Sequence, residues 1–260
     1  MRKTKRLLCI VIVLALAVSL FAFPASADNS VSEADYPFVF VHGLMGWGAR
    51  SDLDPIVPYW GMTTGNLMKY LNGKGFESYA ELLLKWNKVY NLTAIRNPEE
   101  VLTHHLLDSA TLVPALQRFV PGVDAVLDVG CGGGLPSVPL ALLLPHVSVM
   151  GVDAVGKKAA FVNQAAIELG LKNLTARHAR VERMVGTWKA ITSRAFASLA
   201  DFTYLTMHLL ASDGRWLAMK GVVPEDEIAA LPSNVKVLAI EKLVVPGLEE
   251  ERHLIVLGKE

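Results

Sequence analysis

The chain has 260 residues, of which 52% are hydrophobic, and its 25 basic and 25 acidic residues cancel to a formal net charge of zero. This length allows one large domain, or one domain with an appendage, and supplies enough apolar residues for a buried core. The balanced charge gives no sign of an electrostatic partner across the whole chain. The two cysteines, Cys9 and Cys131, are too few for a disulfide framework or a metal cluster.

Residues 1–27 have the pattern of a secretory signal peptide. Four of the first six residues are basic, residues 7–23 are apolar, and Ala25-Ser26-Ala27 is a small-residue cleavage site. An apolar stretch of this length lies at the lower end of the range for a membrane span. An uncleaved anchor is therefore the second interpretation, and only in that case do we expect a stable membrane partner.

Residues 28–78 resemble part of a different kind of protein. A strand-like run, residues 36–41, leads into His42-Gly43 and a glycine-rich turn, and residues 59–71 have a helical pattern. This segment resembles the first core strand and oxyanion loop of secreted bacterial lipases of the α/β-hydrolase fold. Such a lipase needs a serine in the pattern G-x-S-x-G, and the chain contains none. We therefore do not expect acyl transfer.

From residue 79 onward, helical patterns alternate with short apolar runs. We expect helices at 79–89, 98–116, 137–143, 157–168 and 202–210, and strands at 125–129, 147–152, 174–177, 190–193 and 215–220. Residues 235–243 and 253–257 favour two antiparallel strands at the end. Alternation of this kind predicts an α/β fold with a mainly parallel central sheet, right-handed crossovers and a ligand at the carboxyl ends of the strands.

A glycine-rich loop follows the first of these strands. Asp128 precedes four glycines, at positions 130, 132, 133 and 134, and a second strand about twenty residues later ends in Asp153. Glycines let the backbone turn sharply and approach a ligand closely, and an acid at the tip of the second strand is suited to ribose hydroxyls. The loop, its leading strand and the spaced acid together predict a site for a nucleoside cofactor.

Several motifs of residues 79–260 occur together in one known family. They are Leu82–Ile95, His105–Ser109, Asp128–Pro136, Ser193–Ser198, Lys220-Gly221 and Glu251–His253, in order over about 180 residues. This region resembles the bacterial small-subunit rRNA methyltransferase G family, also called glucose-inhibited division protein B. The resemblance implies a Rossmann-like class I methyltransferase that transfers a methyl group from S-adenosylmethionine to N7 of a guanine in 16S rRNA.

The same resemblance implies a set of site residues. The cofactor contacts are expected at Asp128, Gly130, Gly132, Leu135, Asp153, Val181, Glu182 and Arg194. Candidates for RNA contacts are His105, Lys157, Lys158, Lys220 and Arg252, although a structural capping network is an equal alternative for the helix that carries His105. We assign no catalytic residue, because guanine N7 already has a free lone pair and the reaction needs orientation more than proton transfer. We expect no metal.

The resemblances divide the chain into a signal-peptide-like segment (1–27), a lipase-like fragment (28–78) and a methyltransferase domain (79–260). A change of family at residue 79 suggests a fusion or chimera. Two alternatives remain: a secreted lipase- or esterase-like protein without its nucleophile, and a non-catalytic fusion product. The partner is expected to be 16S rRNA or the small ribosomal subunit, with a monomeric protein acting in the cytoplasm, whereas the leader alone would predict secretion.

Overall fold

A computed structural model describes Leu71 and residues 73–260 of the chain. The signal-peptide-like segment and nearly all of the lipase-like fragment therefore lie outside the described residues. Leu71–Glu260 form one compact unit.

The described residues form a seven-stranded sheet with the order β3-β2-β1-β4-β5-β7-β6. The strands β1 to β5 run parallel, and β7 lies antiparallel between β5 and β6. This arrangement confirms the predicted α/β class with a mainly parallel sheet and an antiparallel ending. The strands are β1 (Ala125–Val129), β2 (Ser148–Asp153), β3 (Leu174–His178), β4 (Trp188–Arg194), β5 (Leu210–Lys220), β6 (Val235–Leu243) and β7 (Arg252–Lys259).

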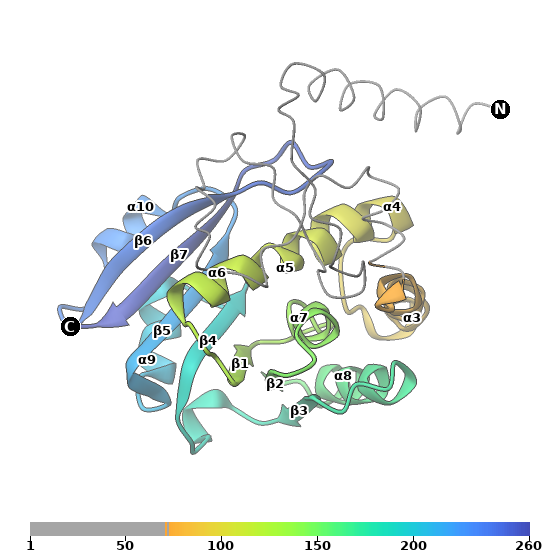
Figure 1. The fold of residues 1–260 in the computed structure, drawn as a ribbon, viewed down its shortest axis with the longest axis horizontal. Helices are drawn as coiled ribbons and strands as arrows, with labels where there is room; N and C mark the ends of the chain where they lie inside the picture. The colour runs from red at the N-terminus through yellow and green to blue at the C-terminus, as the bar shows by residue number, and fades with distance from the viewer. Residues whose placement is uncertain (1–70, 72) are drawn as a thin grey trace, which may run out of the picture. The chain divides into compact units, whose positions relative to one another are not determined.

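Helices cover both faces of this sheet. In Figure 1, α9 and α10 lie on one side of the sheet, and α7, α8 and α3 lie on the other. The helices are α3 (Phe76–Tyr90), α4 (Pro98–Val101), α5 (Asp108–Ala110), α6 (Leu112–Phe119), α7 (Ser137–Leu143), α8 (Gly156–Glu168), α9 (Leu199–Thr206) and α10 (Glu225–Ala229). Two further turns are a π-helix, η1 (Leu102–Leu107), and a 3-10 helix, η2 (Val181–Arg183).

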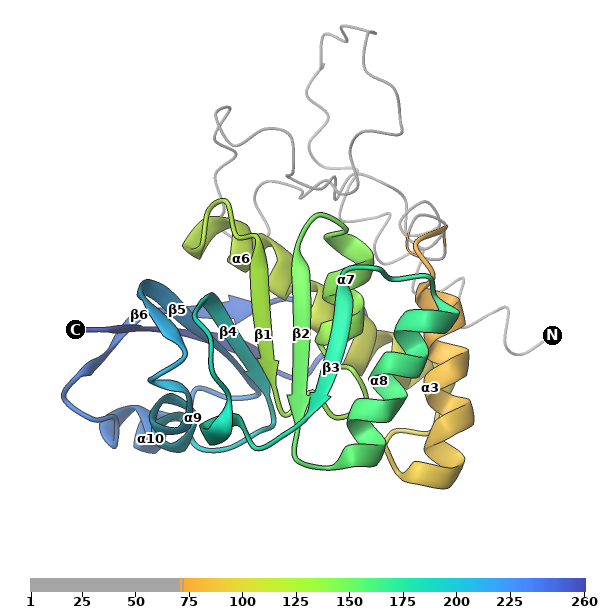
Figure 2. The same ribbon diagram turned by 90° about the horizontal axis from the view of Figure 1, so that it is seen from below.

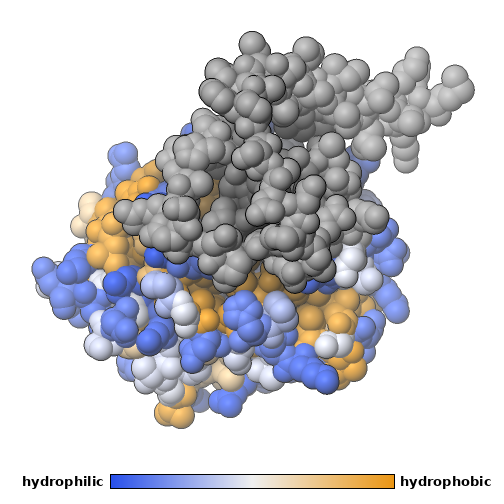
Figure 3. All heavy atoms as spheres, in the orientation of Figure 1, coloured by the Kyte–Doolittle hydropathy of each residue, from blue (hydrophilic) through white to orange (hydrophobic). Residues whose placement is uncertain are grey.

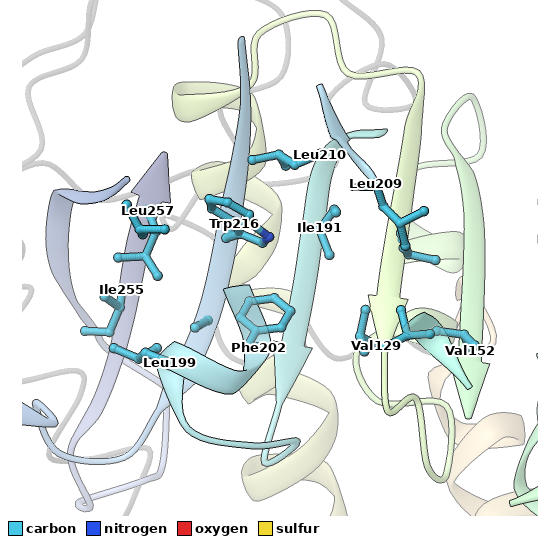
Figure 4. Packing of buried hydrophobic residues seen from close by; sticks show 14 of the residues in the cluster. Val129, Val152, Ile191, Leu199, Phe202, Leu209, Leu210, Trp216, Ile255 and Leu257 are labelled. Carbon is cyan, nitrogen blue, oxygen red and sulfur yellow. The ribbon is translucent and has the colours of Figure 1, made fainter. Parts of the chain in front are cut away.

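The core between the sheet and α9 is built from apolar side chains of the strands (Figure 4). Trp216 on β5 is fully buried there, and its indole N–H donates to the Thr206 hydroxyl at 2.8 Å. Parallel strands are covered on both faces, which is why β1 reads as a continuous apolar run interrupted only by Asp128. Elsewhere, hydrophilic residues occupy much of the visible described surface, with smaller hydrophobic areas between them (Figure 3).

Three of the predicted elements have clearly different bounds in the structure. The helix expected at 98–116 is divided by the π-helix Leu102–Leu107 and bends again near Thr111. The helix expected at 202–210 spans Leu199–Thr206, because Ser198 caps its start by accepting from the Asp201 N–H. The strand expected at 215–220 begins at Leu210 and contains an irregularity. Trp188 on β4 pairs with Leu210, whereas Ala190, only two residues further along β4, pairs with Arg215.

Candidate functional site

The strands β1, β2 and β4 end on the same side of the sheet (Figure 2), and the predicted cofactor residues Gly130, Asp153 and Arg194 lie at or directly after these ends. In the strand register, Val129 on β1 lies beside the residues that precede Asp153 and Arg194. Gly130, Asp153 and Arg194 therefore leave the sheet at the same level, although they are far apart in the sequence. The parallel register thus brings together the glycine loop, the acid and the arginine.

The glycine loop is held to the neighbouring strand by its own backbone. The N–H groups of Gly130 and Cys131 both donate to the Val152 carbonyl, at 2.8 and 3.1 Å. The loop closes when the N–H groups of Gly134 and Leu135 donate to the Cys131 carbonyl, at 2.7 and 3.1 Å. Gly130 and Gly134 have φ values of 74° and 83°, in the left-handed region that glycine adopts without a steric penalty.

The turn after β4 lies directly against this loop. A Cβ atom at Gly130 would lie 2.6 Å from Cδ2 of Phe196, which no real contact allows. Phe196 also packs edge-on against Phe202, with ring centroids 6.3 Å apart. The preceding residue, Ala195, has a φ of 54°, which is strained for a residue with a Cβ atom and persists only where the surroundings impose it.

Lys220, a predicted RNA contact, provides part of that restraint. Its Nζ donates to the Ala197 carbonyl at 3.1 Å and forms an ion pair with Glu227 at 2.8 Å, and its side chain is only 19% exposed. The Glu227 carboxylate also accepts from the Leu199 N–H at 2.6 Å. Lys220 therefore braces the turn that follows β4 from inside the fold.

Asp153 connects the end of β2 to two loops. One carboxylate oxygen accepts from the Gly132 N–H at 3.0 Å, and the other accepts from the Val155 N–H at 2.8 Å. The residue is 7% exposed. A carboxylate has about four acceptor positions, so these two bonds leave capacity for hydroxyl donors on a ligand.

Asp128 lies beneath the glycine loop and is completely buried. One of its oxygens accepts from both the hydroxyl and the N–H of Ser137 at the start of α7. The other oxygen, Oδ1, has no hydrogen-bond partner among the described residues. Burial raises the pKa of Asp128 to about 6, and the bonds from Ser137 oppose that rise only in part. A buried carboxyl oxygen without a partner is costly and is suited to a donor supplied by a ligand.

Arg194 is fixed at the end of β4 by the broken helix that the sequence pattern did not predict. Its Nη1 donates to the His104 carbonyl and to the Asp108 carboxylate, both at 3.0 Å, and its side chain is 18% exposed. The π-helix Leu102–Leu107 contributes that carbonyl, and π-helical turns are frequent at functional sites. A second arginine, Arg252, lies with its Nε 3.6 Å from the other Asp108 oxygen.

His105 also faces this cluster instead of solvent. Its Nε2 lies 2.5 Å from the Thr93 hydroxyl, and its Nδ1 lies 3.2 Å from Nη2 of Arg194. Burial and the neighbouring guanidinium lower the pKa of His105 to about 4, so the ring is neutral near pH 7. His105 therefore contacts Arg194, and Arg252 lies near Asp108, so these two predicted RNA contacts belong to the cluster around Arg194 and Asp108.

The remaining predicted residues divide into buried and exposed ones. Leu135 and Val181 are both 5% exposed, whereas Glu182 is exposed and lies 4.0 Å from an arginine nitrogen of Arg180. Lys157 and Lys158 lie in the first turn of α8, next to Asp153, and Lys157 is exposed.

Three further residues of this region were missed by the sequence analysis. Tyr79 was assigned only to a helix, but its hydroxyl donates to the Gly133 carbonyl at 2.5 Å. No pattern in the sequence indicates that contact. Arg177, near the end of β3, and Arg180, shortly after it, are both exposed on the same side of the sheet. An excess of basic residues over positions 154–189 was visible in the sequence and could have identified them: seven are basic and two are acidic.

Within Leu71 and residues 73–260, no helix is long and apolar enough to cross a membrane. The same residues contain no group of three or more His, Cys, Asp or Glu side chains that could hold a metal ion.

The sequence profile of the family described as rRNA small subunit methyltransferase G matches residues 72–255. A ribosomal RNA small subunit methyltransferase G from Acidovorax sp. (strain JS42) is 55% identical over 188 residues, which cover 69% of this chain and 83% of that protein. The protein of the same name from Azoarcus sp. (strain BH72) is 52% identical over 184 residues, 70% of this chain and 85% of that one. Among solved structures, TrmN from Thermus thermophilus is 21% identical with a TM-score of 0.49, covering 61% of this chain and 53% of that one.

Proposed function

The chain belongs to the rRNA small subunit methyltransferase G family, and from this premise we propose that it transfers a methyl group from S-adenosylmethionine to N7 of a guanine in 16S rRNA. The observation that carries the proposal is the shared edge of β1, β2 and β4, where a glycine loop, Asp153 and Arg194 meet. We further propose that residues 79–260 act as the methyltransferase domain, as a monomer in the cytoplasm, where rRNA is available.

The residues at this edge fit the cofactor. The close approach of Phe196 to Gly130 leaves no room for a Cβ atom, so the loop presents bare backbone. The unpartnered oxygen of Asp128 would be satisfied by a cationic donor such as the ammonium group of the methionine portion. We assign the ribose hydroxyls to Asp153. Contacts with the rest of the cofactor are assigned to Gly132, Leu135, Val181, Glu182 and Arg194.

The chemistry requires positioning rather than acid–base catalysis. When bound, S-adenosylmethionine supplies an electrophilic methyl group on a sulfonium sulfur. Guanine N7 has a free lone pair, so the protein must hold the base in line with the methyl group and exclude water. The braced turn of Ala195 and Phe196 beside the loop can provide such a fixed wall, because Lys220 and Glu227 prevent it from relaxing.

RNA would approach along the basic side of the domain. Residues 154–189 contain seven basic and two acidic residues, whereas residues 221–251 contain two basic and seven acidic ones. The exposed Lys157 and Arg180 follow β2 and β3, and the exposed Arg177 lies near the carboxyl end of β3, beside the cofactor edge. Phosphate binding needs local positive charge of this kind. Lys158 adds to this basic surface. His105 and Arg252 support the site from the cluster around Arg194 and Asp108, and Lys220 supports it from the turn after β4.

The cofactor assignment can be tested by isothermal titration of S-adenosylmethionine into the full chain. We expect saturable binding, and we expect Asp153→Ala to abolish it, because this change also releases the bonds to Gly132 and Val155. Asp213→Ala is the matched control, since Asp213 is an exposed acid. Nucleosides from methylated 16S rRNA should contain 7-methylguanosine. Absence of cofactor binding, or methylation at another atom, would refute the proposal.

The RNA surface can be tested with a paired substitution. Lys157→Gln with Lys158→Gln should weaken rRNA binding and reduce the dependence of log affinity on log salt by about 1.5, since each phosphate contact contributes roughly 0.7–0.9. Lys236→Gln with Lys242→Gln, on the distant strand β6, provides the control. Equal effects of the two pairs would show that only the total charge matters.

A further inference from the structure

Helix α3 supports the glycine loop from behind through one buried tyrosine. Tyr79 is completely buried, and its hydroxyl donates to the Gly133 carbonyl at 2.5 Å across 54 residues of sequence. Burial raises the pKa of Tyr79 well above its ordinary value, so the hydroxyl keeps its proton and remains a donor. Leu83 of the same helix lies close as well, because a Cβ atom at Gly133 would be 3.1 Å from its Cδ1.

The carbonyl that Tyr79 holds belongs to an intrinsically mobile part of the loop. The peptide unit between Gly133 and Gly134 is flanked by two residues without Cβ atoms, so its rotation meets little steric resistance. At one end, the Gly134 N–H donates to the Cys131 carbonyl at 2.7 Å. At the other end, Tyr79 binds the oxygen. The tyrosine hydroxyl therefore provides the tertiary restraint on the orientation of this peptide.

We propose that Tyr79 is a positioning residue for the cofactor: its hydroxyl fixes the Gly133–Gly134 peptide and so keeps the loop in its binding shape. The inference rests on the proposed function, because the loop matters only if it binds S-adenosylmethionine. Without the hydroxyl, the loop populates other peptide orientations, and binding requires that the correct one be selected first. The ring of Tyr79 touches no reacting atom in this mechanism.

Tyr79→Phe tests this role, since it removes one oxygen and keeps the ring. We expect the dissociation constant of S-adenosylmethionine to rise about three- to tenfold, the range that corresponds to losing one buried hydrogen bond. In steady-state assays, the KM for the cofactor should rise by a similar factor while kcat changes less than about twofold. Exchange of the Gly134 amide hydrogen should accelerate, because its peptide is no longer held at both ends.

Thr206→Val is the matched control. Its hydroxyl is also fully buried and bonded, with the Phe202 carbonyl and the Trp216 indole as partners, but Thr206 is the last residue of α9 and packs against the core. This variant should lose thermal stability and keep its cofactor affinity. If Tyr79→Phe also lowers the melting temperature without changing affinity or Gly134 exchange, Tyr79 is only structural and the inference is wrong. Failure of the unsubstituted chain to bind the cofactor would instead overturn the proposed function.

Discussion

Replacing Asp128 with asparagine should change how the stability of the protein depends on pH. Burial raises the pKa of Asp128 from its ordinary 3.8 to about 6, so the folded state holds this proton more tightly than the unfolded state does. The stabilising contribution of such a group is fully present below pH 3.8 and is lost as the pH rises through about 6. An asparagine does not ionise, so the stability of the variant does not fall in this way as the pH rises.

The size of the effect follows from the shift in pKa. Each pK unit corresponds to about 1.4 kcal/mol, so the total loss attributable to Asp128 is about 3 kcal/mol, and roughly half of it falls between pH 5 and pH 8. The asparagine oxygen can still accept from Ser137, while its nitrogen takes the place of the unpartnered oxygen. The free-energy cost of placing this nitrogen does not depend on pH. It therefore changes the difference in free energy of unfolding between the two proteins by the same amount at every pH.

Urea unfolding of both proteins at several pH values between 5 and 8 measures this difference directly. The free energy of unfolding of Asp128→Asn, minus that of the unsubstituted chain, should increase with pH by about 1.4 kcal/mol over this range. His105, whose lowered pKa has the opposite effect, is present in both proteins and cancels. Asp213→Asn, at an exposed acid, is the matched control. The reasoning would be refuted if the difference in free energy of unfolding for Asp128→Asn did not change with pH, or if it increased as the pH was lowered.

Three further substitutions test residues that form or support the cofactor site. Gly130→Val should eliminate cofactor binding in titration calorimetry, because its Cβ would overlap Phe196 and its φ is left-handed; retained affinity would contradict the close approach. Lys220→Met should leave Glu227 unpaired, lower the melting temperature by several degrees and reduce kcat more than cofactor affinity, and an unchanged kcat would show that the turn is not needed. Arg194→Lys should reduce methyl transfer at least tenfold, since one ammonium group cannot replace both Nη1, which binds His104 and Asp108, and Nη2, which lies beside His105; full activity would remove Arg194 from the site.

The sequence predicted the parts of this fold that depend on local patterns. Apolar runs identified the strands, and the structure pairs the two strands that carry Asp128 and Asp153 side by side. The π-helix at Leu102–Leu107 could not be predicted in this way. The residue that donates to its His104 carbonyl, Arg194, comes from a strand about ninety residues later. A contact of that kind exists only after the sheet has assembled.

The same distinction explains which site residues were interpreted incompletely. Lys220 and Arg252 belong to motifs that the chain shares with the family, and their positive charge suggested that they face RNA. In the structure, Lys220 pairs with Glu227, and Arg252 lies beside Asp108. A sequence shows that a residue is charged, but only the fold shows which opposite charge lies beside it.

The contact from Tyr79 bears on the boundary of the catalytic unit. The family profile begins at residue 72, and helix α3 begins at Phe76, so the matched region includes the whole helix that supports the glycine loop. The buried face of α3 packs against α7 and α8, the two helices that follow the loop and Asp153. Because the loop depends on this helix for a hydrogen bond, α3 is part of the cofactor site and not a linker before it.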